Sequence, residues 1–464
     1  MTIASAPTSG PVKRLLTIFG GPTLLLAVGL GLSAIAGSGF IATVNHSGLP
    51  STEIAPLPGL YLLLSAVGTG MFAGFEQEMT RAVSRALALG QPEHVVIRHQ
   101  VRNAAFVAAG TVVVLCAASP FVVHKWMYGN WVVFFELLLG LAGTWAAFLV
   151  RGVLSGRRQF RSYAITMVVE GLSRLLPAIL LAVAGLTSTW GFGLVFSFGF
   201  VVAALSGLVV KRAPITDDAP PPEDVDRELE SANQAAKRLA RLTGGIMAGQ
   251  VLVYAVPLFI NAHLSAPSEA GLVISVTAAI GLTRLALLVL FPLQAPLLPK
   301  LSAAAARHEM GAVRRTTVGL VAACIGAGLI GMLVTVTVGP WIVHVVMGGP
   351  VQLSRVFLGE LAVGTLFMLV ANVLQSALIA LNRQQTVLVG WVVGVVVMGL
   401  MFLLPFSVLT TGAVAAMCGP LATMLLMGFD VLRVTRVPAA AGSGRGTGPA
   451  PQPAADAEAV RQSS

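Results

Sequence analysis

One arginine, Arg284, stands alone in a long apolar stretch, AAIGLTRLALLV, where a charge is costly. At a rise of roughly 1.5 Å per helical residue, it lies about 22 Å from the expected outer end of its segment, near the middle of a bilayer. No carboxylate lies one helical turn before or after it. Because a guanidinium bonds two oxygens of a phosphate at once, we expect Arg284 to bind an anionic ligand or to pair with a carboxylate on another helix.

Two further charges, Glu170 and Arg174, lie within another apolar stretch, TMVVEGLSRLLPA. Four residues apart on a helix, they share a face and can neutralise each other. The pair either serves packing alone or is switchable, with a glutamate that takes a proton or an arginine that binds substrate. Pro177, one turn later, removes a backbone hydrogen bond and permits a bend. We predict Arg284, Arg174 and Glu170 as the substrate-binding residues.

The elements that position these charges are membrane-spanning helices. Of the 464 residues 56% are hydrophobic and only 10% are charged, against about 25% charged in soluble domains. The apolar residues form blocks of about 20, the length that crosses a bilayer core. The sequence therefore predicts an all-α, polytopic membrane protein with about twelve spans, near 15–42, 57–75, 103–123, 131–150, 163–184, 191–210, 242–264, 270–298, 316–338, 356–381, 386–406 and 412–430.

The basic residues indicate the orientation of these spans. With the N-terminus inside, 25 of the 29 Lys and Arg residues fall in inner segments and only Lys125 and Arg355 in outer ones. Since cytoplasmic loops carry the excess of Lys and Arg, we expect a multi-pass protein of the cell (inner or plasma) membrane with both termini cytoplasmic. Four arginines that we place in inner loops are predicted to form a cytoplasmic entrance for an anionic headgroup, or to set topology alone: Arg81, Arg85, Arg157 and Arg158.

A hydrophilic linker divides the chain into six spans and six spans. Residues 213–231 are rich in proline and acid, and residues 233–241 resemble a short basic amphipathic helix on the inner leaflet. Matching dipeptides, Gly20-Gly21 with Gly244-Gly245 and Arg158-Gln159 with Arg383-Gln384, favour a duplication. The predicted units are a cytoplasmic tail 1–14, an N-lobe 15–212, a cytoplasmic linker 213–241, a C-lobe 242–436 and a disordered tail 437–464.

Several kinds of catalysis find no support in the sequence. It contains no G-x-x-x-x-G-K-[ST] motif, and no His/Cys cluster has metal-ligand spacing, so we expect no metal and no cofactor. The outer loops are short, with few acidic residues, which argues against a membrane glycosyltransferase or polymerase. The net charge of +10 is spread over membrane loops, which argues against nucleic acid as a partner. We therefore do not expect an enzyme.

Two segments carry a family resemblance. FLVRGVLSGRRQFRSYAITMVVEGLSRLLPAIL, residues 148–180, contains an Arg151-Gly152-x-x-x-Gly156 turn before a basic inner loop, and residues 291–316 form a proline-rich span exit followed by a polar helix. Both are similar to polysaccharide and lipid-linked oligosaccharide flippases of the multidrug/oligosaccharidyl-lipid/polysaccharide exporter superfamily. The resemblance in topology covers about residues 12–436 and implies two six-helix lobes around a central cavity.

Differences from relatives narrow the expected function. The first span carries no charge, unlike that of lipid II flippases and of cation-coupled drug antiporters of the N-lobe type. The resemblance implies a transporter that flips a lipid-linked oligosaccharide or polysaccharide precursor from the inner to the outer leaflet by alternating access. Its implied partners are that anionic lipid-linked glycan, membrane lipids and the glycosyltransferases or polymerase of the same pathway. The alternatives are a non-transporting scaffold or regulator of envelope polysaccharide synthesis and an ion-coupled small-molecule antiporter.

Overall fold

The computed structural model of the chain describes residues 22–209, 232–285, 301, 307, 309–381 and 383–435. Within these residues the structure is helical and contains no strand. Twelve helical segments are long and apolar enough to cross a membrane, so the predicted fold class is confirmed. Large apolar side chains cover their outward faces, including Leu180, Val209 and Ile330, as expected of surfaces that face lipid.

The first half holds six of these segments. They are built from α2 (Pro22–Asn45), α3 (Ser51–Ile54), α4 (Pro56–Leu63), the π-helical η1 (Leu64–Thr69), α5 (Gly70–Ala88), α6 (Glu93–Ala117), α7 (Ser119–Trp126), α8 (Trp131–Gly156), α9 (Phe160–Val183) and α10 (Thr189–Val209). The stretch from α3 to α5 forms one long segment, Ser51–Leu87.

The second half also contains six of these membrane-spanning segments. It contains α11 (Ala232–His263), the short η2 (Pro267–Glu269) leading into the span Pro267–Leu285, α13 (Met310–Thr337), α14 (Gly339–Trp341), the π-helical η3 (Ile342–Val346), α15 (Arg355–Ala380), α16 (Gln384–Met401) and α17 (Val408–Thr435). Residues 286–298 of the predicted eighth span lie outside the described residues, as do both tails and the linker 213–231.

The same helix pairs pack together in both halves. In the first half the fourth span packs on the sixth (α8 on α10), the fifth on the sixth (α9 on α10) and the first on the fifth (α2 on α9). The second half shows the equivalent pairs: α15 on α17, α16 on α17 and α11 on α16. Each half also has a large hydrophobic core almost entirely of its own residues. These matched pairings support the duplication inferred from the dipeptides.

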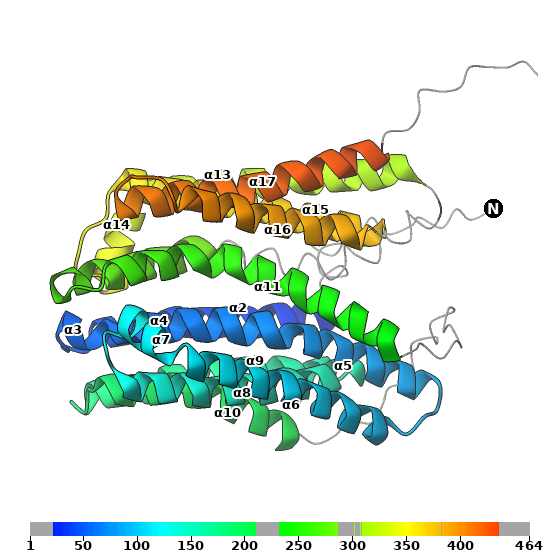
Figure 1. Ribbon diagram of the computed structural model, residues 1–464, viewed down its shortest axis with the longest axis horizontal. Coiled ribbons are helices and arrows are strands. Elements are labelled where there is room, and N and C mark those ends of the chain that lie inside the picture. Colours follow the sequence, from blue (N-terminus) through cyan, green and yellow to red (C-terminus); the bar gives the residue numbers. More distant parts are fainter. Residues whose placement is uncertain are drawn as a thin grey trace, which may run out of the picture.

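The two halves lie side by side, with α11 between the other helices of the second half and those of the first (Figure 1). Along this boundary α11 packs on α5, where Gly74 faces Thr243 closely. Among the described residues, four hydrogen bonds join the halves at one end of the bundle, which we call the outer end after the predicted orientation. Two of them run from Trp126 Nε1 to the Leu258 carbonyl (2.9 Å) and from the Tyr128 hydroxyl to the Leu264 carbonyl (2.6 Å).

Two local predictions are wrong. The residues after 75 are not an inner loop, because α5 continues to Ala88 and buries Met79 and Val83 on one face, so Arg81 and Arg85 lie on a helix. Residues 233–241 are not a separate helix, because α11 runs unbroken from Ala232 to His263. In both places a charged, amphipathic sequence extends a membrane helix beyond the apolar block that predicted it.

Candidate functional site

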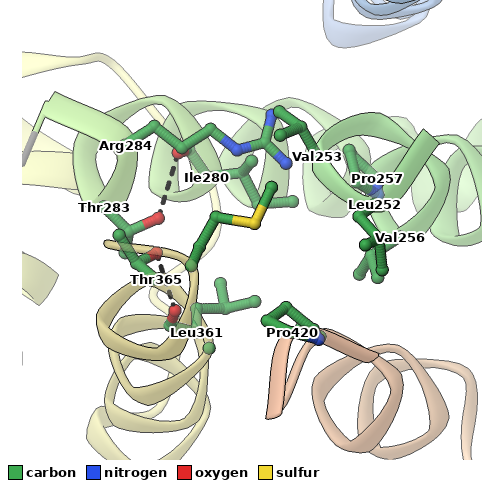
Figure 2. A pocket seen from close by; sticks show the side chains of 13 residues that line it. Leu252, Val253, Val256, Pro257, Ile280, Thr283, Arg284, Leu361, Thr365 and Pro420 are labelled. Carbon is green, nitrogen blue, oxygen red and sulfur yellow. Dashed lines mark hydrogen bonds between the residues drawn. The ribbon is translucent and has the colours of Figure 1, made fainter. Parts of the chain in front are cut away.

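Arg284 lines a small cavity inside the second half (Figure 2). The cavity has a volume of about 40 Å³ and is lined by α11, the span Pro267–Leu285, α15 and α17. Its α15 residues, from Leu361 to Met368, lie in the middle of that helix, as do Ala416 and Pro420 in α17. The cavity is therefore at mid-membrane depth, but it lies within one half of the molecule rather than between the halves.

The guanidinium of Arg284 has an aromatic neighbour and no bonded carboxylate in the described part of the chain. Its central carbon lies 4.9 Å from the centre of the Tyr254 ring. The two hydroxyls at the cavity, Thr283 and Thr365, each donate a hydrogen bond to a carbonyl of their own helix, at 3.0 Å. Their oxygens still have lone pairs with which to accept. The cavity thus offers a cation, two hydroxyl oxygens and apolar walls.

Prolines inside two helices border the same cavity. Pro257 in α11 and Pro420 in α17 lack the N–H that would bond the carbonyl four residues earlier. The carbonyl released by Pro420 is that of Ala416, which would clash with a Cβ on Gly364. Only glycine lets α15 and α17 approach so closely here. The prolines interrupt the hydrogen bonds of two helices at the depth of Arg284.

The second charged cluster lies inside the first half, where two arginines pair with one glutamate and the Nε of Arg174 has no hydrogen-bond partner among the described residues. Glu170 Oε1 accepts a hydrogen bond from Arg174 Nη2 at 2.8 Å, and its Oε2 accepts one from Arg151 Nη2 at 2.6 Å. Arg151 also donates to the Thr166 hydroxyl at 3.0 Å. All three charged side chains are buried, at 6%, 8% and 7% exposure for Arg151, Glu170 and Arg174. One glutamate therefore bridges arginines from α8 and α9.

Aromatic and acidic neighbours complete this cluster. The guanidinium of Arg174 lies 3.8 Å from the ring centre of Phe200 and 4.7 Å from that of Phe196, both on α10. On the α5 side the Tyr163 hydroxyl donates to Glu76 at 2.6 Å. The cluster therefore contains two acidic side chains close to its two arginines, one of them paired with both guanidiniums.

The predicted substrate-binding residues thus separate into two places. The structure brings Glu170 and Arg174 together as one ion pair, and it places Arg284 in the other half of the molecule. Arg151 joins the pair although the sequence motif suggested an inner turn: α8 continues to Gly156, so the turn comes six residues later. The buried position of Arg151 was signalled only by the apolar residues on both sides of it.

The four predicted entrance arginines lie at the end of the helix bundle opposite the outer end, which we call the inner end. Arg81 pairs with Glu78 one turn earlier on α5, with Nη2 and Oε1 2.8 Å apart. Arg157 Nε donates to Glu93 of α6 at 3.0 Å, which ties the α8–α9 turn to a neighbouring helix. Arg158 is exposed in that turn with φ of 58°. Arg85 lies in the last turn of α5, where a positive charge favours the helix end.

Comparisons with known proteins identify the fold. No family model matches the chain. Uncharacterized proteins of Mycobacterium tuberculosis and Mycobacterium bovis are 28% identical over 358 residues, which are 76% of this chain and 79% of theirs. Among solved structures, a multidrug resistance MATE family transporter of the MOP superfamily in an inward-facing conformation is similar with a TM-score of 0.69, at 14% identity, over 87% of this chain and 96% of that one.

Two further structures have the same fold. An outward-facing MATE family transporter gives a TM-score of 0.61 at 14% identity, over 93% of this chain and 99% of that chain. A MOP superfamily transporter from Pyrococcus furiosus gives 0.56 at 13% identity, over 93% of this chain and 100% of its own. For that protein, the reversed polarity of the binding pocket is described as suggesting a different function. This chain therefore has the fold of MATE transporters of the MOP superfamily.

Proposed function

We propose that this protein is a transporter that works by alternating access and moves an anionic, lipid-linked oligosaccharide or polysaccharide precursor from the inner to the outer leaflet. One observation carries the proposal: the guanidinium of Arg284 lines a mid-membrane cavity, with no carboxylate bonded to it within the described residues. A charge at that depth is costly unless something compensates it. A phosphate or pyrophosphate that passes through would do so, by bidentate hydrogen bonds.

The conformation supports a cycle of opening and closing. The fold matches the inward-facing transporter with a higher TM-score than the outward-facing one, 0.69 against 0.61. The interhalf hydrogen bonds at the outer end fit a structure closed on that side. The cavity of about 40 Å³ has room for only about two or three water molecules. Movement of the helices that bear Pro257 and Pro420 is therefore required before a phosphate and its glycan can be bound.

The proposed function also implies a cellular membrane, an orientation in it and partner enzymes. We place the protein in the cell membrane with both termini cytoplasmic, on the bias of basic residues. Arg81, Arg85, Arg157 and Arg158 then line the cytoplasmic side, where they attract an anionic headgroup. Glycosyltransferases would build the glycan before transport, and a polymerase would use it afterwards. The chain itself is not proposed to catalyse a reaction.

The test is transport of a fluorescent polyprenyl-pyrophosphate saccharide in liposomes, read by a membrane-impermeant quencher. Arg284→Ala should reduce the rate by roughly tenfold or more, because a charge-assisted contact is lost, while Arg284→Lys should keep part of it. Arg355→Ala, which removes an exposed arginine at the outer end of α15, is the matched control and should transport normally. Unchanged transport in folded Arg284→Ala protein would remove this residue from the mechanism.

The same liposomes separate the alternatives. An ion-coupled antiporter of the same fold would instead move small molecules in response to a proton or sodium gradient. Because a multidrug transporter is among the similar structures, the antiporter alternative requires this assay. An arginine at the cavity repels cationic compounds, so a cationic dye should not be transported. A protein that moves neither the lipid-linked saccharide nor a small molecule would fit a scaffold in polysaccharide synthesis.

A further inference from the structure

An open groove lies at the inner end of the second half, between the first turns of α13 and the last turn of α17. Its volume is about 360 Å³, and it is lined by Gly311, Arg314, Arg315, Val318 and Thr435. The two helix ends lie side by side in Figure 1. The volume falls in the range of roughly 300–1,000 Å³ that is usual for small-molecule sites. The groove shares no lining residue with the mid-membrane cavity.

The groove lies at the depth of the lipid headgroups. At a rise of about 1.5 Å per residue, Arg315 is roughly 33 Å along α13 from Thr337, the last residue of that helix. The hydrocarbon core of a bilayer is only about 30 Å thick. Arg314 and Arg315 therefore lie just outside the core, on its cytoplasmic side in the predicted orientation. Basic residues at this depth meet the anionic headgroups of the inner leaflet.

The two arginines of the groove are not neutralised within the described part of the chain. Arg314 and Arg315 are both exposed, and neither forms an ion pair there. The acids of the two helix ends, Glu309 and Asp430, are each paired with another arginine, at 3.2 and 2.7 Å. The groove thus carries an uncompensated positive charge. Since each guanidinium can bond two phosphate oxygens at once, the groove favours a phosphate-bearing ligand.

The face of α13 that continues from the groove into the membrane is apolar. Val318 follows Arg314 and Arg315 at helical spacings of four and three residues, so the three share a face. Ile325 and Leu329 continue this face towards the middle of the membrane, and like Val318 they are exposed. A ligand that bonds the arginines through a phosphate can therefore lay a hydrocarbon chain along α13. A phospholipid has both parts, whereas a phosphate ion or a nucleotide has only one.

We propose that this groove is a binding site for an anionic phospholipid of the inner leaflet. The phosphate bonds Arg314 and Arg315, and an acyl chain covers the exposed apolar face of α13. The first N–H groups of α13 add to the attraction, because a helix N-terminus favours an anion. Since α13 packs mainly on α15 and only lightly on α17, a lipid between the ends of α13 and α17 holds α13 against the bundle. The site does not depend on Arg284 or on the transported substrate.

The test is native mass spectrometry of the delipidated full-length protein, titrated with phosphatidylglycerol or with phosphatidylcholine of the same acyl chains. The wild type should bind one phosphatidylglycerol roughly tenfold more tightly than phosphatidylcholine, because the anionic headgroup matches the charge of the groove. The double variant Arg314→Gln/Arg315→Gln should lose about tenfold of its affinity for phosphatidylglycerol, because charged hydrogen bonds are removed. Thermal unfolding checks that it remains folded.

The matched control removes two arginines that line neither cavity. Arg98 and Arg102 are exposed and lie one turn apart in the first half of α6. The double variant Arg98→Gln/Arg102→Gln changes the net charge by the same amount as the variant in the groove. It should bind phosphatidylglycerol like the wild type.

A second pair of variants tests the space in the groove rather than its charge. A Cβ on Gly311 would meet nothing within 4 Å, so Gly311→Phe fills the groove with a ring and keeps both arginines. It should weaken the binding of phosphatidylglycerol. Gly331→Phe adds the same ring on another face of α13, where a Cβ also meets nothing within 4 Å. This variant should bind the lipid like the wild type.

Three results would overturn the proposal. They are equal binding of the two phospholipids by the wild type, wild-type affinity in folded Arg314→Gln/Arg315→Gln protein, and an equal loss of affinity in the α6 control. Binding of the polyprenyl-pyrophosphate saccharide in place of phosphatidylglycerol would also overturn it, because the groove would then belong to the substrate. Loss of transport in Arg284→Ala with normal phospholipid binding concerns the proposed function alone, so the two proposals can fail separately.

Discussion

The two halves of this protein both place arginine among membrane helices, and they compensate the charge in different ways. In the first half Arg151 and Arg174 share the carboxylate of Glu170, at 2.6 and 2.8 Å. In the second half Arg284 lies against the ring of Tyr254 and at the wall of a cavity. The equivalent helix pairs pack alike in both halves, so the difference lies in side chains rather than in fold.

This difference indicates which arginine is available to a ligand. A buried arginine that already pairs with a carboxylate must give up that pair before it can bind a ligand anion with both terminal nitrogens, and breaking the pair leaves an uncompensated charge. A cation that faces only an aromatic ring gains modest stabilisation from it. We therefore interpret the cluster around Glu170 as structural and Arg284 as the group that binds substrate.

The largest expected effect comes from breaking the paired cluster. Glu170→Gln leaves Arg151 and Arg174 buried with only Glu76 nearby, and should destabilise the folded protein by about 3–5 kcal/mol. Thermal unfolding in detergent measures the loss of stability, with thiol labelling of the buried Cys324 as the signal of unfolding. Glu309→Gln, which breaks an exposed pair with Arg307, should change stability by less than about 1 kcal/mol. Equal stability of Glu170→Gln and wild type would end the structural interpretation.

How much of this difference between the halves the sequence predicts depends on how far apart the interacting residues lie in the chain. The spans and the Glu170–Arg174 pair follow from hydropathy and from a spacing of four residues, and the structure contains both. Arg151 joins Glu170 from another helix, nineteen residues away, which no local pattern encodes. From the sequence, the lack of a carboxylate near Arg284 can be established only for the neighbouring turns of its own helix. That its cavity lies within one half depends on how α11, α15 and α17 pack.

A carboxylate placed in the second half should make it resemble the first. Thr365 lies on the wall of the same cavity as Arg284 (Figure 2). Thr365→Glu should neutralise the guanidinium and reduce transport of the pyrophosphate-linked saccharide by roughly tenfold, while the protein stays folded. The side chain introduced by Thr365→Gln is as large as that of Thr365→Glu but carries no charge, so this variant should retain more transport activity. If both variants transport equally, volume rather than charge controls the cavity, and the contrast between the halves loses its functional meaning.

The smallest expected effect concerns the aromatic neighbour of Arg284. Tyr254→Phe keeps a ring beneath the guanidinium and should leave transport and stability nearly unchanged. Tyr254→Leu removes the ring, and should cost about 0.5–2 kcal/mol of stability because the cation–π contact is lost. Unfolding curves of both variants, with and without Arg284→Ala, measure the coupling between the two side chains. Coupling near zero would mean that the ring does not hold the arginine, whereas a value in this range would show that the ring stabilises Arg284 in place at the wall of the cavity.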